Sequence, residues 1–434
     1  VGGSGAGGAE SVPARTREGD ANGGVGGVGG EGGDGGRVQG PSAGANEPVS
    51  CASLAEAKKV LYVTGSSAAR PFLELIARQL TLQGVYLVYS ATGSCVGVDA
   101  ALNGTALSAT ATYWDSVVST GATCRLSANG VTTDVAVSDV FAETCPGFEL
   151  ANLSALGVAD AHGPIQTMAF VVPASSPQRV ISSQAAYFVY GFGQAGGVLD
   201  LDGVRRVWSD EGLVFQRNAS SGTQALLAAA IGVPAERFRG QSVKSSDDMA
   251  ASIQAAGIDP ERAANTIGLL AADFIESRDL RASVRVLAYQ DSRQFCGFYP
   301  DSTATARDKQ NVRDGHYALW GPLHLLYKVD SLGNPRNPEN RELVLAMVGY
   351  LSGSKPLPNG VRLIDVYAQS GLVPECAMRV QRTKDGGNVT PFRPNNPCGC
   401  LFEVSATGAT ACKPCTVQGD CSDGETCSLG YCEP

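Results

Sequence analysis

The segment GLVFQRNASSGTQALLAAAIG, residues 212–232, places one arginine directly before a turn of small polar residues and an alanine-rich run. This pattern predicts a strand, a short loop and a helix. A guanidinium is planar, stays charged and matches the oxygen pairs of carboxylates and phosphates. Because the first turn of a helix exposes unpaired backbone N–H groups, Arg217 beside a helix start is typical of an anion-binding site. The alternative is a structural ion pair made by Arg217.

The combination of strand, glycine- and hydroxyl-rich loop and helix occurs three times in the chain. Its copies are YVTGSSAARPF, VYSATGSCVGVDAAL and VFQRNASSGTQALL. Small residues let a ligand approach the backbone N–H groups at a helix start. Glycine and serine are also ordinary turn formers and caps, so one copy alone is weak evidence. Three copies in one chain, one of them with an arginine, favour a shared anion site.

The segments that must position these loops alternate between strand and helix patterns from residue 55 to about residue 367, which predicts α/β layers with largely parallel strands. The predicted helix ARPFLELIARQL has Phe72, Ile76 and Leu80 on one face. SSDDMAASIQAAG is predicted as a helix with a serine cap. The predicted strands are KKVLYVTG, VYLVYS, DVAVSD, QTMAFVVP and GLVFQR.

Composition limits the class of protein. With 434 residues, 43% of them hydrophobic, the chain can form two domains with cores and additional tails. A net charge of −9 argues against a nucleic-acid or anionic-membrane surface, and there is no apolar run long enough to span a bilayer. Residues 1–50 are glycine-rich and are expected to be a disordered tether, either the trimmed leader of an exported lipoprotein or a tail without a role. We expect a monomer.

The chain has 13 cysteines, an odd number that leaves at least one unpaired. Seven of them follow Pro391, so residues 391–434 are predicted to be a disulfide-held module in an oxidising compartment. A zinc site at the CKPC motif is the alternative. Among the others, Cys124 with Cys145 and Cys296 with Cys376 are the pairs we expect. The three histidines, His162, His316 and His324, are too scattered to suggest a metal site, and we expect no cofactor.

Residues 57–370 resemble the phosphate-type periplasmic binding proteins, the solute receptors of phosphate ABC transporters. The motifs that carry the resemblance are VTGSSAARPFLELIARQL, YSATGSCVGVDAAL, TTDVAVSD, QRNASSGTQ, AANTIGLLAADF and RDGHYALWGPLHLLYKV. The resemblance implies the α/β, two-lobed type II periplasmic-binding-protein fold with mixed, mostly parallel sheets. Lobe 1 would comprise residues 51–170 and 285–390, and lobe 2 residues 171–284.

The resemblance also implies a set of ligand-binding residues. Arg217 would be the cationic contact, and Asp139 would accept a hydrogen bond from a protonated ligand oxygen, which favours hydrogenphosphate over sulfate. Serine hydroxyls, one threonine hydroxyl and backbone N–H groups of the three loops would supply the remaining donors: Ser66, Ser67, Ala68, Ala69, Ser94, Ser221, Gly222 and Thr223. In the plainer interpretation Asp139 caps a turn, and Ser94 and Ser221 are helix caps.

The sequence departs from the family pattern at three positions. A ligand threonine expected near Ala68 or Ala69 is missing, Arg70 replaces an apolar or aromatic residue, and Ala219 replaces a second acidic residue. Sulfate, molybdate and phosphonates therefore remain candidate ligands. The expected function is non-enzymatic capture of phosphate or a related oxyanion in the periplasm or at the cell surface, for an ABC permease or for sensing. A secreted phosphatase on the same core and a ligand-dead surface interaction protein are the alternatives.

Overall fold

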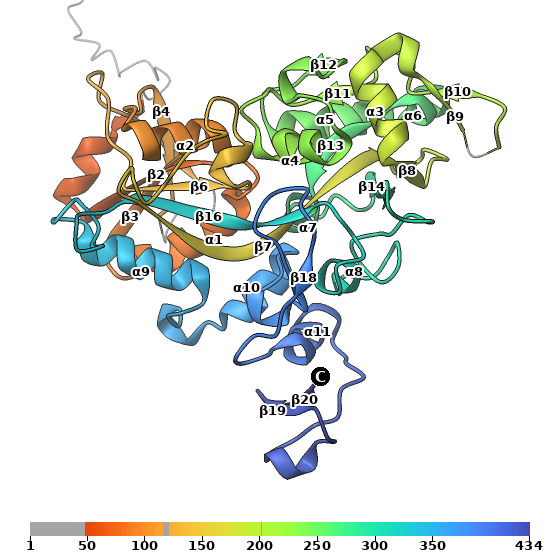
Figure 1. Cartoon of the computed structure of the whole chain (residues 1–434). Helices are drawn as coiled ribbons and strands as arrows, with labels where there is room; N and C mark the ends of the chain where they lie inside the picture. The colour runs from red at the N-terminus through yellow and green to blue at the C-terminus, as the bar shows by residue number, and fades with distance from the viewer. Residues whose placement is uncertain (1–47, 116–120, 201) are drawn as a thin grey trace, which may run out of the picture. The chain divides into compact units, whose positions relative to one another are not determined.

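The computed structural model describes residues 48–434, apart from residues 116–120 and 201. Its main element is a mixed ten-stranded sheet with the order β1-β5-β4-β3-β2-β6-β16-β7-β13, in which β14 also pairs with β7 (Figure 1). The strands are β1 (Val49–Ser50), β2 (Lys59–Gly65), β3 (Val85–Ser90), β4 (Thr110–Tyr113), β5 (Ala122–Arg125), β6 (Val135–Ser138), β7 (Val158–Pro173), β13 (Gly268–Ala271), β14 (Val284–Val286) and β16 (Trp320–Lys328).

The α/β class and the mixed sheet are confirmed, but the expected majority of parallel strands is wrong. Within the large sheet only β1–β5, β2–β3 and β2–β6 are parallel pairs, and the other six pairs are antiparallel. The long strands β7 and β16 account for this difference. They pair with each other and with their further neighbours in antiparallel fashion, which needs no crossover helix.

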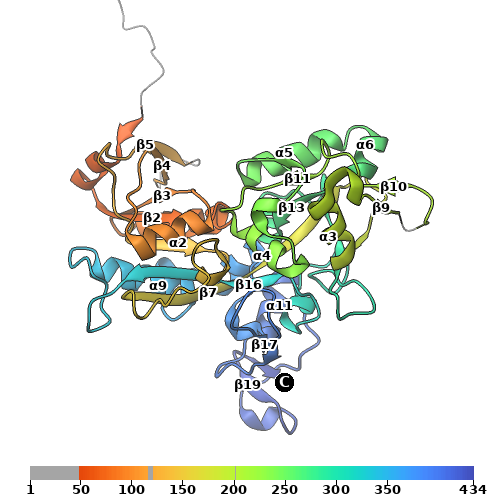
Figure 2. The ribbon, with the colours of Figure 1, turned by 45° about the horizontal axis from the view of Figure 1, so that its top comes forward.

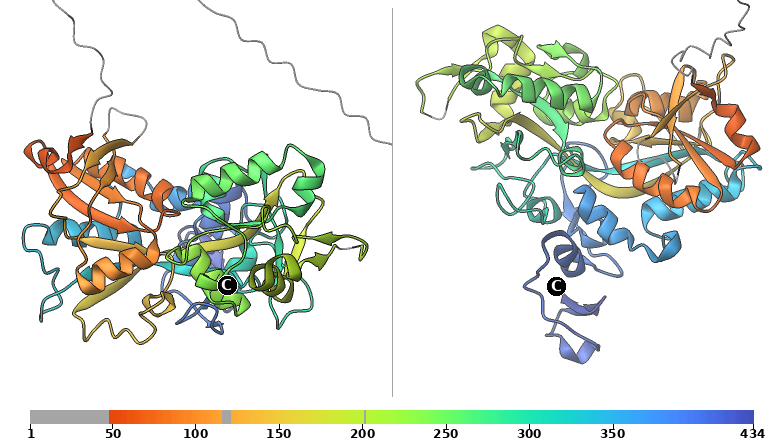
Figure 3. Two further views of the ribbon diagram at one scale, coloured as in Figure 1. Left: turned by 90° about the horizontal axis from the view of Figure 1, so that it is seen from above. Right: turned by 180° about the vertical axis from the view of Figure 1, so that it is seen from behind.

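Strand β7 connects two parts of the structure. Eight of its first ten residues pair with β16, and its last six pair with β13 and β14. It therefore extends from the red and orange part of the chain into the green part (Figures 1 and 3). From Gly163 to Pro173 the strand is continuously buried, because both of its faces are covered.

The helices beside the first strands cover both faces of the sheet. Helices α1 (Arg70–Thr81), α9 (Arg341–Ser352) and α10 (Leu363–Ser370) share one hydrophobic cluster with Leu61 and Val63 of β2. Helix α2 (Ser94–Asn103) contacts β2 and β6 and contributes to two other clusters. Phe72, Ile76 and Leu80 of α1 are all buried, as their spacing predicts.

A second group of helices surrounds β13. It comprises α3 (Ser183–Phe192), α4 (Gly222–Ile231), α5 (Ser246–Ala256), α6 (Pro260–Asn265) and α7 (Ala272–Ser277). Helix α5 begins with a capping box of Ser245 and Asp248, which confirms the predicted serine cap. Small two-stranded sheets lie next to these helices: β9 (Val198–Leu199) with β10 (Arg206–Val207), β11 (Phe215–Gln216) with β12 (Gln241–Ser242), and β8 (Val180–Ser182) with β15 (Ala288–Gln290).

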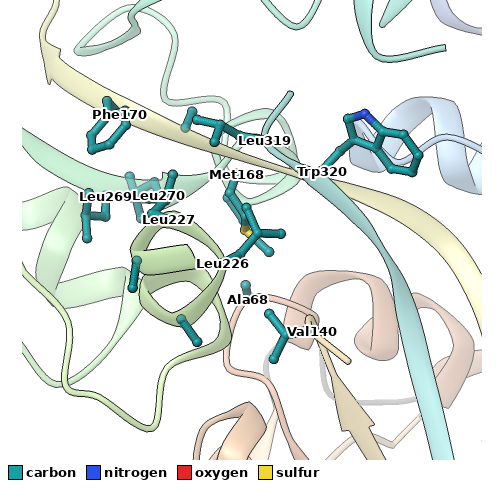
Figure 4. Packing of buried hydrophobic residues seen from close by; sticks show 14 of the residues in the cluster. Ala68, Val140, Met168, Phe170, Leu226, Leu227, Leu269, Leu270, Leu319 and Trp320 are labelled. Carbon is teal, nitrogen blue, oxygen red and sulfur yellow. The ribbon is translucent and has the colours of Figure 1, made fainter. Parts of the chain in front are cut away.

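The main core joins segments that are distant in the sequence. Ala68, from the loop before α1, and Val140, after β6, lie beside Leu226 of α4 and Met168 of β7 (Figure 4). All four are at most 1% exposed. This packing fixes the loop before α1 and the end of β6 against the start of α4.

The C-terminal segment is crosslinked as predicted, since all seven cysteines after Pro391 are in disulfides. Three bonds lie within the module, and Cys376–Cys398 joins it to the preceding chain. The buried Arg313 of α8 (Gln310–Arg313) pairs with Glu403 at 2.8 Å. The elements of this region are β17 (Val380–Gln381), β18 (Thr390–Pro391), α11 (Gly399–Thr407), β19 (Thr426–Ser428) and β20 (Tyr431–Glu433).

Both expected disulfides of the central region are wrong. Cys51 pairs with Cys124 and Cys95 with Cys145, while Cys296 is free and exposed. Parallel pairing of β1 with β5 brings Cys51 beside Cys124, which sequence spacing does not show. The free Cys296 agrees with the odd cysteine count.

Two predictions concern the ends and the membrane. The tether predicted for residues 1–50 lies outside the described residues except for 48–50, where Val49 and Ser50 already form β1. Among the helices of the described residues, none has the length and apolar character that a membrane crossing requires.

Candidate functional site

The three loops that sequence analysis predicts to share a site contact one another. Cys95 at the start of α2 donates its backbone N–H to the oxygen of Ser220, 3.0 Å away, in the loop before α4. A Cβ placed on Gly222 would lie 2.4 Å from Ser94 Oγ and 2.8 Å from Asp139 Cβ, so no side chain fits there. The starts of α2 and α4 therefore meet at the end of β6 (Figure 2).

Arg217 lies directly after β11 and is 3% exposed. Its guanidinium donates to Ser246 Oγ at 3.0 Å, to Ser67 Oγ at 3.1 Å and to the backbone oxygen of Lys244 at 3.2 Å. The bond to Ser67 connects the arginine loop to the loop before α1, 150 residues away in the chain.

The charge of Arg217 has no counterion in direct contact. Within the described part of the chain, no carboxylate oxygen lies within 4.0 Å of its nitrogens, and its buried Nε has no partner. Burial lowers the pKa of Arg217, while Asp139 and the acidic residues at the start of α5 act in the opposite direction. A buried cation without a contacting anion is unfavourable, so the geometry favours an external anion as its partner.

Asp139 follows β6 and is 2% exposed. Its backbone N–H donates to Ser94 Oγ at 3.2 Å, and its Oδ1 atom is buried without a partner. Burial raises the pKa of Asp139 to about 6, against the lowering effects of Ser66, Ser94 and Arg217. The site therefore contains a carboxylate oxygen, Asp139 Oδ1, that can still accept a hydrogen bond.

The loop before α1 uses its own donors internally. Ser66 Oγ accepts hydrogen bonds from the N–H groups of Ala68 at 3.1 Å and Ala69 at 3.3 Å. These are the two N–H groups that the family resemblance assigns to the ligand. Both alanines are buried in hydrophobic clusters, whereas Ser67 is partly exposed and contacts Arg217.

The helix starts supply further donors. Ser221 is the N-cap residue of α4, yet its side chain makes no capping hydrogen bond. Ser221 and Thr223 are buried at 3% and 1% exposure, and Ser94 at 0%. Gly93, the N-cap residue of α2, has a φ of 103°, a conformation that favours glycine. The first N–H groups of both helices have no acceptor within their own helix.

Two further buried carboxylates lie near Asp139, and sequence analysis missed both. Asp385 accepts from the N–H of Phe141 at 2.9 Å and from Thr144 Oγ1 at 2.7 Å, and Asp273 accepts from Gln166 Nε2 at 2.8 Å. Burial raises the pKa of both groups, and Asp139 raises that of Asp273 further. No local pattern could have indicated Asp385, because it lies between β17 and β18, 246 positions after Asp139.

In the sequence the three histidines are too scattered to suggest a metal site, but two of them lie close together in the structure. The rings of His162 and His324 lie 5.0 Å apart between centroids, because β7 and β16 pair in that register. His316 is separate and stacks on Phe298 at 5.2 Å.

Comparisons with known proteins give fold similarities only. No family model matches the chain, and no curated protein sequence matches it. Among solved structures, it is similar to a putative phosphate ABC transporter substrate-binding protein from Clostridium perfringens, crystallised with phosphate, at 13% identity and a TM-score of 0.48, covering 73% of this chain and 99% of that one. It is also similar to an ABC-type phosphate transport receptor from Vibrio cholerae (14% identity, TM-score 0.43, 72% and 99% covered).

A third similar structure belongs to a different functional group. It is the regulatory domain of CcmR from Synechocystis in complex with 2-PG, at 10% identity and a TM-score of 0.38, covering 70% of this chain and 99% of that domain. At these identities the similarities concern the fold alone.

Proposed function

We propose that the protein is a solute-binding protein that captures phosphate or a related tetrahedral oxyanion at the Arg217 site. The observation that carries this proposal is the guanidinium itself, which is 3% exposed, donates to Ser246 at the start of α5 and to Ser67 before α1, and has no contacting carboxylate. Helix starts and guanidinium groups are the two elements that proteins most commonly use to bind oxyanions.

The proposed ligand contacts come from opposite sides of the site. Ser67 and Ser94 belong to the part of the chain that forms β2 and β3, and Arg217, Gly222 and Thr223 belong to the part around β13. We propose that these parts are the two lobes, 51–170 with 285–390 and 171–284, and that they close on the ligand by hinge motion. Affinity then depends on loops from both lobes.

Transport or sensing outside the cytoplasm is part of the proposal. Six disulfides favour an oxidising compartment. An ABC permease is the proposed partner for transport, with the glycine-rich N-terminal stretch as a tether. We propose that the protein acts as a monomer.

Binding is favoured over phosphatase chemistry. A phosphatase needs a nucleophile and an adjacent base or metal. Among the hydrogen bonds of the described residues, none joins a serine or threonine of the three loops to a histidine. The site hydroxyls lie next to backbone N–H groups and Arg217.

A ligand-dead interaction protein is the second candidate, and one observation favours it. The NH1 and NH2 groups of Arg217 already bond to Ser67, Ser246 and Lys244, and Gly222 contacts Ser94 directly. These bonds leave only the Nε–H and one NH1 hydrogen of the guanidinium for an anion. In this function the C-terminal cysteine-rich module would be the interaction surface.

Isothermal titration calorimetry distinguishes these candidates. Purified protein is unfolded, dialysed free of anions, refolded without reductant, and titrated with phosphate, sulfate, molybdate and methylphosphonate, with acetate as the control anion. We expect one-to-one binding of at least one tetrahedral oxyanion and none of acetate. If the protein binds none of the four oxyanions while its unfolding transition is intact, the proposal is contradicted and the ligand-dead candidate is supported. Release of phosphate from p-nitrophenyl phosphate would instead support the phosphatase.

A further inference from the structure

A cluster of two histidines and one aspartate lies on the paired strands β7 and β16. Asp160 and His162 are two positions apart on β7, so their side chains emerge on the same face of the strand. His324 of β16 is directly opposite His162 in the antiparallel register. The pairing is irregular between Pro322 and His324, a feature that often redirects a side chain.

The ligand-type atoms of this cluster converge. His324 Nδ1 lies 2.8 Å from Asp160 Oδ2, and His162 Nε2 lies 3.9 Å from the same oxygen. All three groups offer an atom within 4.8 Å of the others. In a tetrahedral zinc site with bonds of about 2.0–2.1 Å, neighbouring ligand atoms are ~3.3 Å apart. The two observed distances to the Asp160 oxygen lie on either side of that value.

The surroundings of the cluster differ between its inner and outer sides. His324 is 0% exposed, and its Nε2 atom is buried without a partner. The ring of Phe141 covers the inner side, 4.3 Å from His324 and 6.1 Å from His162 between centroids. The His162 side chain is 42% exposed, so an ion and a coordinating water can reach the cluster from solvent.

A purely structural role accounts for only part of this arrangement. The hydrogen bond between Asp160 and His324 would hold His324 in place by itself, but it assigns no role to His162. The carboxyl group of Asp385 is close enough to interact electrostatically with His324, and its Oδ1 is also buried without a partner. Metal binding at Nδ1 would place the imidazole proton on Nε2, where a metal-bound histidine normally meets an acceptor.

We propose that Asp160, His162 and His324 bind one divalent first-row transition metal ion, with Zn²⁺ as the preferred candidate. Two imidazole nitrogens and one carboxylate oxygen are a ligand set that zinc accepts, and a water molecule would complete the tetrahedron. Among the described residues, one other group has metal-ligand spacing, Cys415, Cys421 and Cys432, and its members are all in disulfides, so it is not a competing site. This inference is independent of the proposed anion binding.

The test is a titration of the full oxidised chain with Zn²⁺, after treatment with a chelator and dialysis. The background carries Cys296→Ser, because the free thiol is exposed and would bind zinc itself. We expect one zinc ion per chain by calorimetry. His162→Gln should weaken binding by more than the roughly 100-fold that loss of an outer-shell partner causes. His162 is the most exposed of the three ligands, so this variant should fold.

His316→Gln is the matched control and should leave the zinc affinity unchanged, because His316 lies outside the cluster and stacks on Phe298. Imidazole NMR signals provide a second measurement, since the chain has only three histidines. Zinc should shift the signals of His162 and His324 and leave those of His316 in place. Absence of one-to-one binding, or equal affinities for the His162→Gln and His316→Gln variants, would overturn the proposal.

Discussion

Two buried cations of this protein have opposite environments. Lys309, at 1% exposure, contacts Asp301 Oδ1 at 2.9 Å and Glu276 Oε1 at 3.4 Å. Arg281 binds the same two carboxylates, so the charges are balanced within the chain. The pKa of Glu276 is lowered, because the nearby cations outweigh the raising effect of burial. Arg217 is buried to a similar degree and contacts only hydroxyl and carbonyl oxygens.

The presence or absence of a contacting carboxylate indicates whether a buried cation serves the fold or a binding site. Proteins rarely bury a cation fully unless it is paired, because the desolvation penalty must be offset. The Lys309 cluster fulfils this requirement from its own sequence and is expected to contribute to stability. Arg217 lacks a contacting counterion and lies where three loops meet, so we expect its charge to serve binding rather than folding.

The strongest test of the comparison is Lys309→Met, which leaves two buried carboxylates with fewer partners. We expect a loss of about 3–5 kcal/mol in the free energy of unfolding, measured by urea denaturation with disulfides intact. Lys384→Met is the control at an exposed lysine and should change stability by less than about 0.5 kcal/mol. Equal stabilities of the two variants would show that the buried network is not structural.

Arg217→Met should reduce anion affinity more than it reduces the free energy of unfolding. We expect the affinity for the bound oxyanion to fall by about 2–5 kcal/mol, which is roughly 30-fold or more, because the ligand loses its cationic partner. The free energy of unfolding should fall by less than in Lys309→Met. Arg237→Met is the control, since Arg237 is exposed in the same part of the chain. A large loss of stability with unchanged affinity would assign Arg217 to the fold.

Asp139→Asn tests whether the carboxyl group near Arg217 makes the stability of the protein depend on pH. Burial raises the pKa of Asp139 from 3.8 to about 6, so the folded protein holds this proton more tightly than the unfolded chain does. The stability that this proton contributes is fully present below about pH 4 and is lost as the pH rises through about 6. The expected loss is roughly 3 kcal/mol, because each tenfold change in proton affinity between the folded and unfolded chain corresponds to about 1.36 kcal/mol.

The measurement is the free energy of unfolding of anion-free protein between pH 4 and pH 7. Asp139→Asn should remove this part of the pH dependence and leave the contribution of Asp385, whose pKa is also raised by burial. Identical pH profiles for the variant and the unaltered protein would contradict the assignment to Asp139.

The smallest expected effect comes from Gly222→Ala. The added methyl group would meet Ser94 Oγ and Asp139 Cβ, so the starts of α2 and α4 must separate. We expect a loss of about 1–3 kcal/mol in stability, as for other overpacked sites, together with weaker anion binding. Gly419→Ala is the control, because a methyl group there meets no atom within 4 Å. Unchanged affinity in Gly222→Ala would show that close contact of the two helix starts is not required for binding.

Local patterns in the sequence predicted the components of the candidate site well. Amphipathic spacing predicted the position of α1, and small residues before apolar runs predicted where α2 and α4 begin. Each of these signals arises from interactions within a few residues, such as caps, turns and helix periodicity. The family resemblance, in contrast, implied that the N–H groups of Ala68 and Ala69 face a ligand, whereas in the structure they donate to Ser66 Oγ.

Contacts between residues distant in the chain could not be predicted from the sequence. The partners of Cys124 and Cys376, the position of Asp385 beside Asp139 and the meeting of His162 with His324 all depend on which strands and loops become neighbours. Neighbours in a sheet are selected by the packing of whole elements, and a single sequence contains no direct signal for that selection. The sequence by itself therefore determined the helix starts, the strands and the cationic side chain. Only the tertiary structure decided that Arg217 has no contacting counterion, because that depends on side chains distant in the chain.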